Sequence, residues 1–170
     1  MDFLKLAKDR YSCRKLTDKA IEPEKIERIL EAAIAAPTAK NNQPYRIWKI
    51  QTPESLEKVK QATNFTFGAG LVMVVGVKKN EAFVRPFDGM NYAEVDGAIV
   101  ATHLMLAVKA EGLDTTWVGM FDAFKLQSLF ADMKGYELIA LFPIGYADES
   151  AKPSPRHEDR RAIEKVVVEL

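Results

Sequence analysis

The sequence predicts an α+β fold, in which helices pack around a central β-sheet, and three features carry this prediction. Strand-like and helix-like segments are mixed without the regular alternation of a parallel α/β fold. Two apolar runs, 71–77 and 137–146, have the length and composition of strands that are buried on both faces. The segment 92–111 is apolar on nearly all sides, which is typical of a helix in the middle of a core or at a subunit contact.

Before the first of these apolar runs, the sequence predicts three helices and one strand. Asp2 can cap a short helix that runs to about residue 8. Pro23 is a good first-turn residue for a second helix, whose apolar stripe consists of Ile26, Ile29, Leu30, Ala33 and Ile34. Aromatic and β-branched residues at 45–50 indicate a strand. Thr52, followed by a proline and an acidic residue, marks the start of a helix that runs to about residue 61.

Turn and capping residues divide the second half of the chain. The connection 78–91 contains a proline and an Asp-Gly pair, and we expect it to be long and mobile. A short strand or turn is expected at 115–119, and Asp122 can cap a helix that runs to about residue 130. The segment 150–161 is rich in proline and charge, so it should be extended on the surface, and the valines at 166–168 could form a terminal strand.

Length and composition fit one domain, 1–170, and restrict its partners. The chain is 48% apolar and 28% charged, as expected for an ordinary globular domain. Its 24 basic and 24 acidic residues leave no net charge, which argues against a nucleic acid partner. The single cysteine, Cys13, fits a reducing compartment. Neither a signal peptide nor a membrane-spanning run is visible, so we expect a soluble, cytoplasmic protein without membrane contact.

The sequence lacks the familiar motifs of side-chain and metal catalysis. It contains neither the glycine-rich dinucleotide motif nor the P-loop. One cysteine and two distant histidines, His103 and His157, argue against a zinc site. We expect His103 to be a structural imidazole within the apolar helix, and Cys13 to be a thiol without catalytic role. No catalytic side chain and no metal are therefore assigned.

Two polar segments point to a bound ligand. Arg10, Ser12 and Arg14 alternate, so in an extended chain they share one face. The two guanidinium groups repel each other unless an anion such as phosphate lies between them, although a solvated basic strip is the alternative. The segment 37–44 carries small residues and amides that can bond a heterocycle or a ribityl chain, with an ordinary turn as the alternative. Later residues could add a close backbone approach and further positive charge: Gly119, Arg156, Arg160 and Arg161.

Five blocks of the chain, in this order, resemble the nitroreductase family of FMN-dependent flavoproteins. The blocks at 10–15 and 36–45 are similar to the family's R-x-S-x-R-x-[FY] and A-P-[ST]-x-x-N-x-Q-P-W signatures. Leu16 and Tyr45 stand where these signatures have an aromatic residue and a tryptophan. The other three blocks are Asp-Gly-Ala-Ile, Trp-Val-Gly-Met-Phe and Pro-Ile-Gly-Tyr, at 96–99, 117–121 and 143–146. The resemblance covers almost the whole chain.

The resemblance implies a nitroreductase-like fold with a mixed or antiparallel sheet, assembled as an intertwined homodimer with two FMN molecules in its interface. Arg10 and Ser12 would hold the phosphate and ribityl side, joined by Arg160 or Arg161. Arg14 would lie near N1 and O2 of the isoalloxazine, where a positive charge stabilises the reduced flavin. The partner subunit would supply Pro37, Thr38, Ala39, Asn41 and Gln43. Near N5 and O4 of the ring would lie the backbone of Trp117, Val118 and Gly119.

The resemblance also implies an NAD(P)H-dependent FMN oxidoreductase. NADH or NADPH would deliver hydride to N5 of FMN and leave, and an oxidised small molecule such as a nitroaromatic or a quinone would then take the electrons in a ping-pong cycle. Phe83 or Phe87 would line the acceptor site, if 78–91 is a lid and not a disordered linker. Three alternatives stay open: a module that binds or senses FMN without efficient turnover, a flavin-free interaction domain, and a flavin enzyme of different chemistry such as reductive dehalogenation.

Overall fold

A four-stranded antiparallel sheet forms the centre of the computed structural model, which describes residues 2–170. Its strand order is β1-β2-β4-β3, with β1 at Tyr45–Ile50, β2 at Leu71–Val77, β3 at Asp114–Thr115 and β4 at Glu137–Gly145. The predicted α+β class is confirmed, and every neighbouring pair of strands is antiparallel. The two apolar runs are the central strands β2 and β4. All residues of β2 are buried, which explains why its sequence does not alternate.

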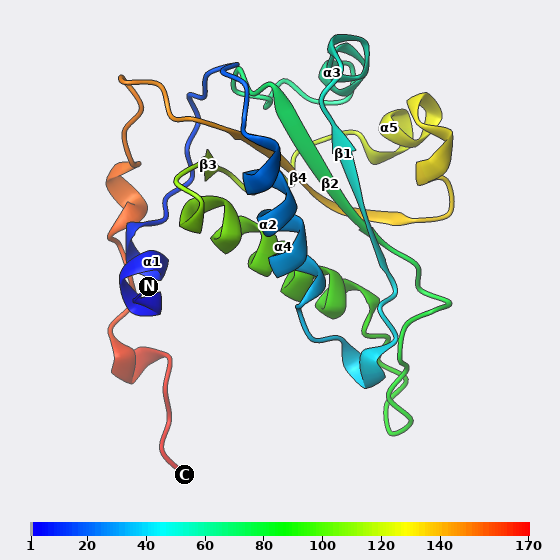
Figure 1. Cartoon of the computed structure of the whole chain (residues 1–170). Helices are drawn as coiled ribbons and strands as arrows, with labels where there is room; N and C mark the ends of the chain where they lie inside the picture. Colours follow the sequence, from blue (N-terminus) through cyan, green and yellow to red (C-terminus); the bar gives the residue numbers. More distant parts are fainter. Residues whose placement is uncertain (1) are drawn as a thin grey trace.

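Helices cover both faces of the sheet (Figure 1). On one face α4 (Ala93–Ala110) lies against the sheet and α2 (Pro23–Ile34) packs against α4. On the other face lie α3 (Pro53–Lys60) and α5 (Ala123–Leu129). The short helix α1 (Phe3–Asp9) lies at the margin of the molecule, beside the C-terminal segment. Within residues 2–170, no helix combines the length and the apolar character that crossing a membrane requires.

Helix α4 contacts the sheet closely because Gly97 lies in its first turns. A Cβ at this position would lie 2.6 Å from Cγ1 of Val77 and 3.1 Å from Cγ1 of Ile139, so a side chain would push the helix away from β2 and β4. Since α2 covers the opposite side of α4, apolar residues occur nearly all round the helix. The prediction of a helix in the middle of a core is therefore confirmed.

The connection 78–91 differs from the long, mobile segment that the sequence predicts. Its second part closes as a hairpin, which we call the 83–92 hairpin. The amide of Arg85 donates to the carbonyl of Met90, and the amide of Tyr92 donates to the carbonyl of Phe83, both at 2.9 Å. Val84 pairs with Asn91 in an isolated bridge. An ion pair between Arg85 and Asp88 closes the turn. The ordered hairpin also differs from the alternative of a disordered linker.

Two further predictions of local structure are wrong. The valines at 166–168 do not form a strand, because the chain there makes a short 3-10 turn at Ile163–Lys165 and then runs on without a strand partner. Ile34, the last residue of α2, is 61% exposed although it continues the apolar stripe, so the buried part of the stripe ends at Ala33. The segment 150–161 is extended and mostly exposed, as predicted, except for one 3-10 turn at Pro155–His157.

Candidate functional site

A cavity of about 260 Å³ gathers basic side chains from two distant parts of the chain. It lies between the 10–14 segment and the C-terminal segment, and we call it the cationic cavity. Its lining consists of Arg10, Tyr11, Ser12, Arg14, Ser154, Arg156, His157 and Arg160. No carboxylate of the described residues lines it, so its four guanidinium groups favour a bound anion. The structure thus brings Arg10, Ser12, Arg14 and Arg160 together, whereas Arg161 is not among the lining residues.

The C-terminal wall of the cationic cavity is attached to the N-terminal segment through His157. Its Nε2 atom lies 3.0 Å from the carbonyl oxygen of Lys8, and its ring meets the ring of Tyr11 edge to face at 6.2 Å. Burial, together with a hydrogen bond to Cys13, raises the pKa of Tyr11 above its usual value of 10.0. The phenol therefore stays neutral at physiological pH and adds no negative charge to the wall.

Backbone hydrogen bonds fix the 10–16 segment on the body of the protein. The amide of Cys13 donates to the carbonyl of Thr115 at 3.1 Å, and the amide of Leu16 donates to the carbonyl of Phe67 at 2.9 Å. Cys13 and Leu16 are buried, whereas Arg14 is exposed. Gly68 permits this close approach, because a Cβ there would lie 2.7 Å from the carbonyl oxygen of Leu16 and the residue has a φ of +84°. The basic side chains are therefore presented from a rigid backbone.

A second, smaller cavity of about 170 Å³ adjoins Arg14, and we call it the aromatic cavity. Its lining consists of Arg14, Phe65, Phe67, Thr116, Trp117, Val118, Gly119 and Met120. The predicted segment 117–119 thus lies beside Arg14, which lines both cavities. Sequence reasoning missed Phe65, Phe67 and Met120. The only local sign was the alternation of two phenylalanines before a glycine.

The loop 37–44, by contrast, lies in another part of the same chain. It connects α2 to β1 through a 3-10 turn at Ala39–Asn41. The amide of Ala39 donates to Oδ1 of Asp96 at 2.9 Å. Nζ of Lys40 lies 4.9 Å from the centre of the Phe83 ring, so the loop adjoins the 83–92 hairpin. Phe87, at the turn of that hairpin, is 94% exposed.

The predicted site residues therefore form two groups at opposite ends of α4 (Figure 1). Asp96, which holds the loop, lies in the first turn of the helix. Lys109, in the last turn, donates from Nζ to Oδ1 of Asp114 at 2.8 Å. The next residue, Thr115, accepts the hydrogen bond from the amide of Cys13. Eighteen helical residues span about 27 Å. One chain therefore does not bring the loop, or Phe83 and Phe87, to the two cavities.

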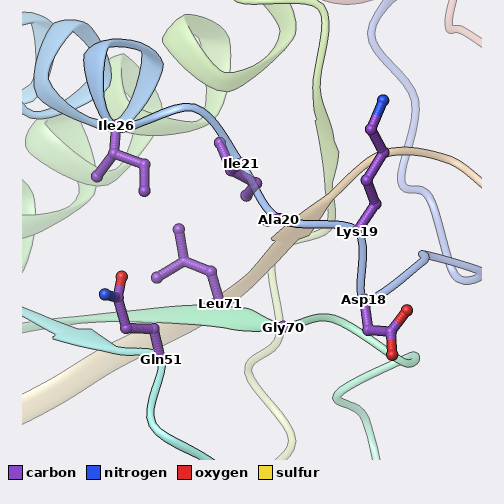
Figure 2. Close-up of a pocket in the computed structure, with 8 residues that line it drawn as sticks. All are labelled: Asp18, Lys19, Ala20, Ile21, Ile26, Gln51, Gly70 and Leu71. Atoms are coloured by element: carbon purple, nitrogen blue, oxygen red, sulfur yellow. The ribbon is translucent and has the colours of Figure 1, made fainter.

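Near the start of β2 lie two larger cavities of mixed charge. Figure 2 shows one of about 290 Å³ at the start of β2, with Asp18 and Gln51 on opposite sides of Leu71. A neighbouring cavity of about 430 Å³ shares Asp18 and adds Glu57 and Lys60. Each of these linings contains a single lysine, with one carboxylate in the first cavity and two in the second, so neither favours an anion as the cationic cavity does.

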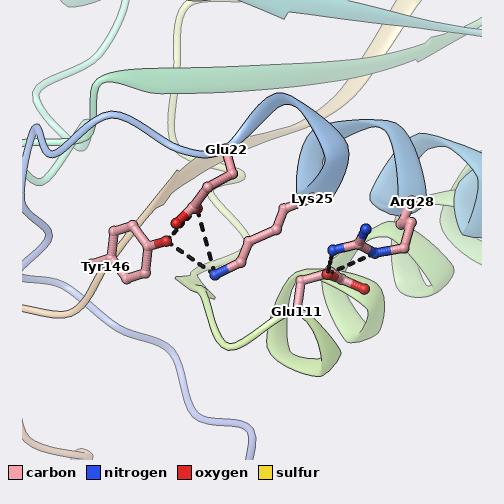
Figure 3. A network of polar contacts seen from close by, with 5 residues as sticks. All are labelled: Glu22, Lys25, Arg28, Glu111 and Tyr146. Carbon is pink, nitrogen blue, oxygen red and sulfur yellow. Dashed lines mark hydrogen bonds and ion pairs between the residues drawn. The ribbon is translucent and has the colours of Figure 1, made fainter.

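The last of the five blocks ends in a residue with a structural role. The hydroxyl of Tyr146 donates to Oε2 of Glu22 at 2.5 Å and accepts from Nζ of Lys25 at 3.0 Å (Figure 3). The hydrogen bond from Tyr146 lowers the pKa of Glu22 to about 2. Nearby, Arg28 bonds Glu111 at 2.6 Å. These contacts connect α2 to the end of β4 and to the end of α4.

In this antiparallel α+β fold, Arg14 therefore connects a cationic cavity to an aromatic one. The chain belongs to the nitroreductase family, whose model matches residues 7–67 and 60–146. Its fold is similar to that of a nitroreductase family protein from Clostridium difficile, with a TM-score of 0.90, 35% identity and coverage of 99% of this chain and 98% of that one.

Two further relatives extend the comparison. A Haemophilus influenzae protein, provisionally named an NAD(P)H nitroreductase, is 30% identical, and the alignment covers 95% of this chain and 97% of that protein. A crystal structure of an Exiguobacterium sibiricum protein in complex with FMN has a TM-score of 0.84 and 22% identity, and the match covers 100% of this chain and 98% of that one. This last likeness concerns the fold alone.

Proposed function

We propose that the protein is an FMN-dependent oxidoreductase that passes hydride from NADH or NADPH to an oxidised small molecule. The observation that carries the proposal is the position of Arg14, which lines both the cationic and the aromatic cavity. One flavin nucleotide has a phosphate and a planar ring that match these two cavities. The name of the Haemophilus influenzae relative supports the nicotinamide donor, and the resemblance to the FMN-dependent nitroreductase family supports the cofactor.

Each side chain of the two cavities then has a role in binding. Arg10, Ser12 and Arg160 would hold the phosphate, and Arg160 is preferred over Arg161 because it lines the cationic cavity. Arg14 would place its charge beside the pyrimidine edge of the ring. The backbone at 117–119 would lie along the edge that contains N5, and the aromatic side chains of the aromatic cavity would contact the ring. Bound FMN would supply the hydride chemistry, and NAD(P)H and the acceptor would use the same space in turn.

The working unit in this proposal is a homodimer. A second copy would bring its 37–44 loop, its Phe83 and its Phe87 to the two cavities. Within one chain, these residues lie too far from the cavities. The C-terminal segment supports this assembly, since its backbone runs away from the body of the molecule (Figure 1) and its apolar side chains are exposed. These side chains are Ile163, Val166, Val167, Val168 and Leu170. A two-fold axis would make both sites equivalent.

The visible spectrum of the purified protein tests the proposal. We expect flavin absorption bands, either as isolated or after incubation with FMN and removal of the excess. Under anaerobic conditions NADH or NADPH should bleach these bands, and a quinone or a nitroaromatic compound should restore them. Protein that stays colourless after FMN incubation would contradict the proposal. Bound FMN that neither nicotinamide reduces would instead indicate a module that holds the flavin without turnover.

A further inference from the structure

Asp96 is a buried carboxylate that is only partly hydrogen-bonded. Its side chain is 1% exposed, and Oδ1 accepts a hydrogen bond of 2.9 Å from the amide of Ala39. Oδ2 is buried and has no hydrogen-bond partner within residues 2–170. The ion pairs found in that part of the chain do not involve this carboxylate. The neighbouring Gly97 fixes this turn of α4 against the sheet, so the carboxylate has a defined position.

The fold alone gives no reason for a carboxylate at this place. Burying a carboxylate costs stability unless its oxygens are hydrogen-bonded and its charge is balanced. The N-terminal dipole of α4 favours a negative charge in the first turn, but it gives Oδ2 no donor. An apolar side chain of similar size would avoid this cost, but it would leave the amide of Ala39 without its acceptor. The hydrogen bond from the amide of Ala39 to Oδ1 is therefore the best explanation for a carboxylate at position 96.

The loop that Asp96 holds has an unfavourable backbone conformation. Lys40, Asn41 and Gln43 have φ values of 55°, 55° and 50°, in the left-handed region that residues other than glycine seldom adopt. Such conformations persist only where surrounding contacts determine them, and they concentrate at functional sites. Within the loop, Oγ1 of Thr38 accepts from the amide of Gln43 at 3.0 Å. From outside the loop, Asp96 is the buried side chain that binds its backbone.

We propose that Asp96 is a positioning residue of the flavin site, which fixes the 38–43 loop through the amide of Ala39. This inference rests on the proposed function, in which the loop of one copy contacts the flavin bound in the other. The Asp96–Ala39 hydrogen bond connects the loop to α4 and thereby to the sheet. The left-handed residues that follow are then held in one conformation before the flavin binds, which lowers the entropy that binding has to remove.

Variants on both sides of this hydrogen bond provide the test. Asp96→Leu removes the acceptor, whereas Asp96→Asn keeps a carbonyl oxygen for Ala39. Ala39→Pro removes the donor without changing Asp96. Thr38, with φ −130° and ψ 155°, has a conformation that suits a residue before proline, and the first position of a short helix tolerates proline. The FMN dissociation constant of each folded dimer is measured by titration, together with the melting temperature without flavin.

We expect Asp96→Leu and Ala39→Pro each to weaken FMN binding about tenfold, as the loss of one hydrogen bond to a charged group predicts. The double variant should bind FMN about as tightly as whichever single variant has the lower affinity, because both changes remove the same hydrogen bond. Asp96→Asn should stay within about threefold of the unchanged protein. Hydrogen exchange of the 38–43 amides in flavin-free protein should quicken in Asp96→Leu and not in Asp96→Asn.

Three results would overturn the assignment: unchanged FMN affinity in folded Asp96→Leu, additive losses in the double variant, or equal losses in the asparagine and leucine variants. A residue with a structural role alone would lower the melting temperature and leave the affinity of the folded dimer unchanged. If the unchanged protein bound no FMN, the proposed function would fail. The hydrogen-exchange comparison would still show whether Asp96 orders the loop.

Discussion

Replacing Arg14 by alanine is expected to weaken FMN binding about 10- to 30-fold. The guanidinium group lines both cavities, and its Nη1 donates to the carbonyl of Ser12 at 3.3 Å. A hydrogen bond to a charged group contributes about 1.5–3 kcal/mol, and we use the lower half of this range because Arg14 is exposed to solvent. A loss of about 1.5–2 kcal/mol corresponds to that change in the dissociation constant. The substitution leaves the backbone bonds of Cys13 and Leu16 in place, so the fold should be retained.

Fluorescence titration of FMN into the purified protein measures this effect, and Cys13→Ala is the matched control. Cys13 is the neighbouring residue, but it is buried, lines neither cavity and donates its thiol to the carbonyl of Lys15 at 3.2 Å. Its replacement should lower stability and change FMN affinity by less than about twofold. At high ionic strength, the FMN dissociation constants of the Arg14 variant and the unchanged protein should differ less, because salt screens exposed charges. Equal losses in the two variants would refute the role of Arg14.

Three other substitutions test different parts of the structure. Tyr146→Phe should return the pKa of Glu22 from about 2 toward its usual 4.5. Because the folded state lowers this pKa, the carboxylate stabilises the protein above about pH 4.5 and loses that effect as the pH falls toward 2. The urea midpoint should therefore fall less on acidification in the variant, and equal falls would count against the hydrogen bond. Gly97→Ala should lower the free energy of unfolding by about 1–3 kcal/mol in urea, since its Cβ would lie 2.6 Å from a valine side chain of β2, and an unchanged value would mean that α4 can move. Replacing both Phe83 and Phe87 by alanine should raise the KM for an aromatic acceptor about 2- to 10-fold at constant FMN affinity, and unchanged acceptor kinetics would remove these residues from the site.

Features that depend on neighbouring residues could be predicted from the sequence. Asp2, Thr52 and Asp122 each cap a helix as predicted, and each side chain accepts a hydrogen bond from a backbone amide two or three residues ahead. The central strands β2 and β4 were evident because burial on both faces requires an unbroken apolar run. Arg10, Ser12 and Arg14 line one cavity, but so does the intervening Tyr11, so the lining is not explained by the alternation alone.

Features that depend on long-range packing could not be predicted. Phe65 and Met120 line the aromatic cavity because two separate segments of the chain meet there, and no local sequence pattern predicts that contact. The choice between Arg160 and Arg161 depends on the path of the C-terminal segment, which the contact between His157 and Lys8 directs. The 83–92 hairpin adjoins the 37–44 loop, where Nζ of Lys40 lies over the Phe83 ring, and an Asp-Gly pair alone did not reveal this contact.

A crystal structure of the protein with bound FMN tests the central claim most directly. We predict one flavin for each chain, with its phosphate among Arg10, Arg14 and Arg160 and its ring in the aromatic cavity. The 38–43 loop of a second copy should contact the same flavin. A flavin bound in the cavity beside Asp18, or bound by a single chain without the loop of a second copy, would contradict the account.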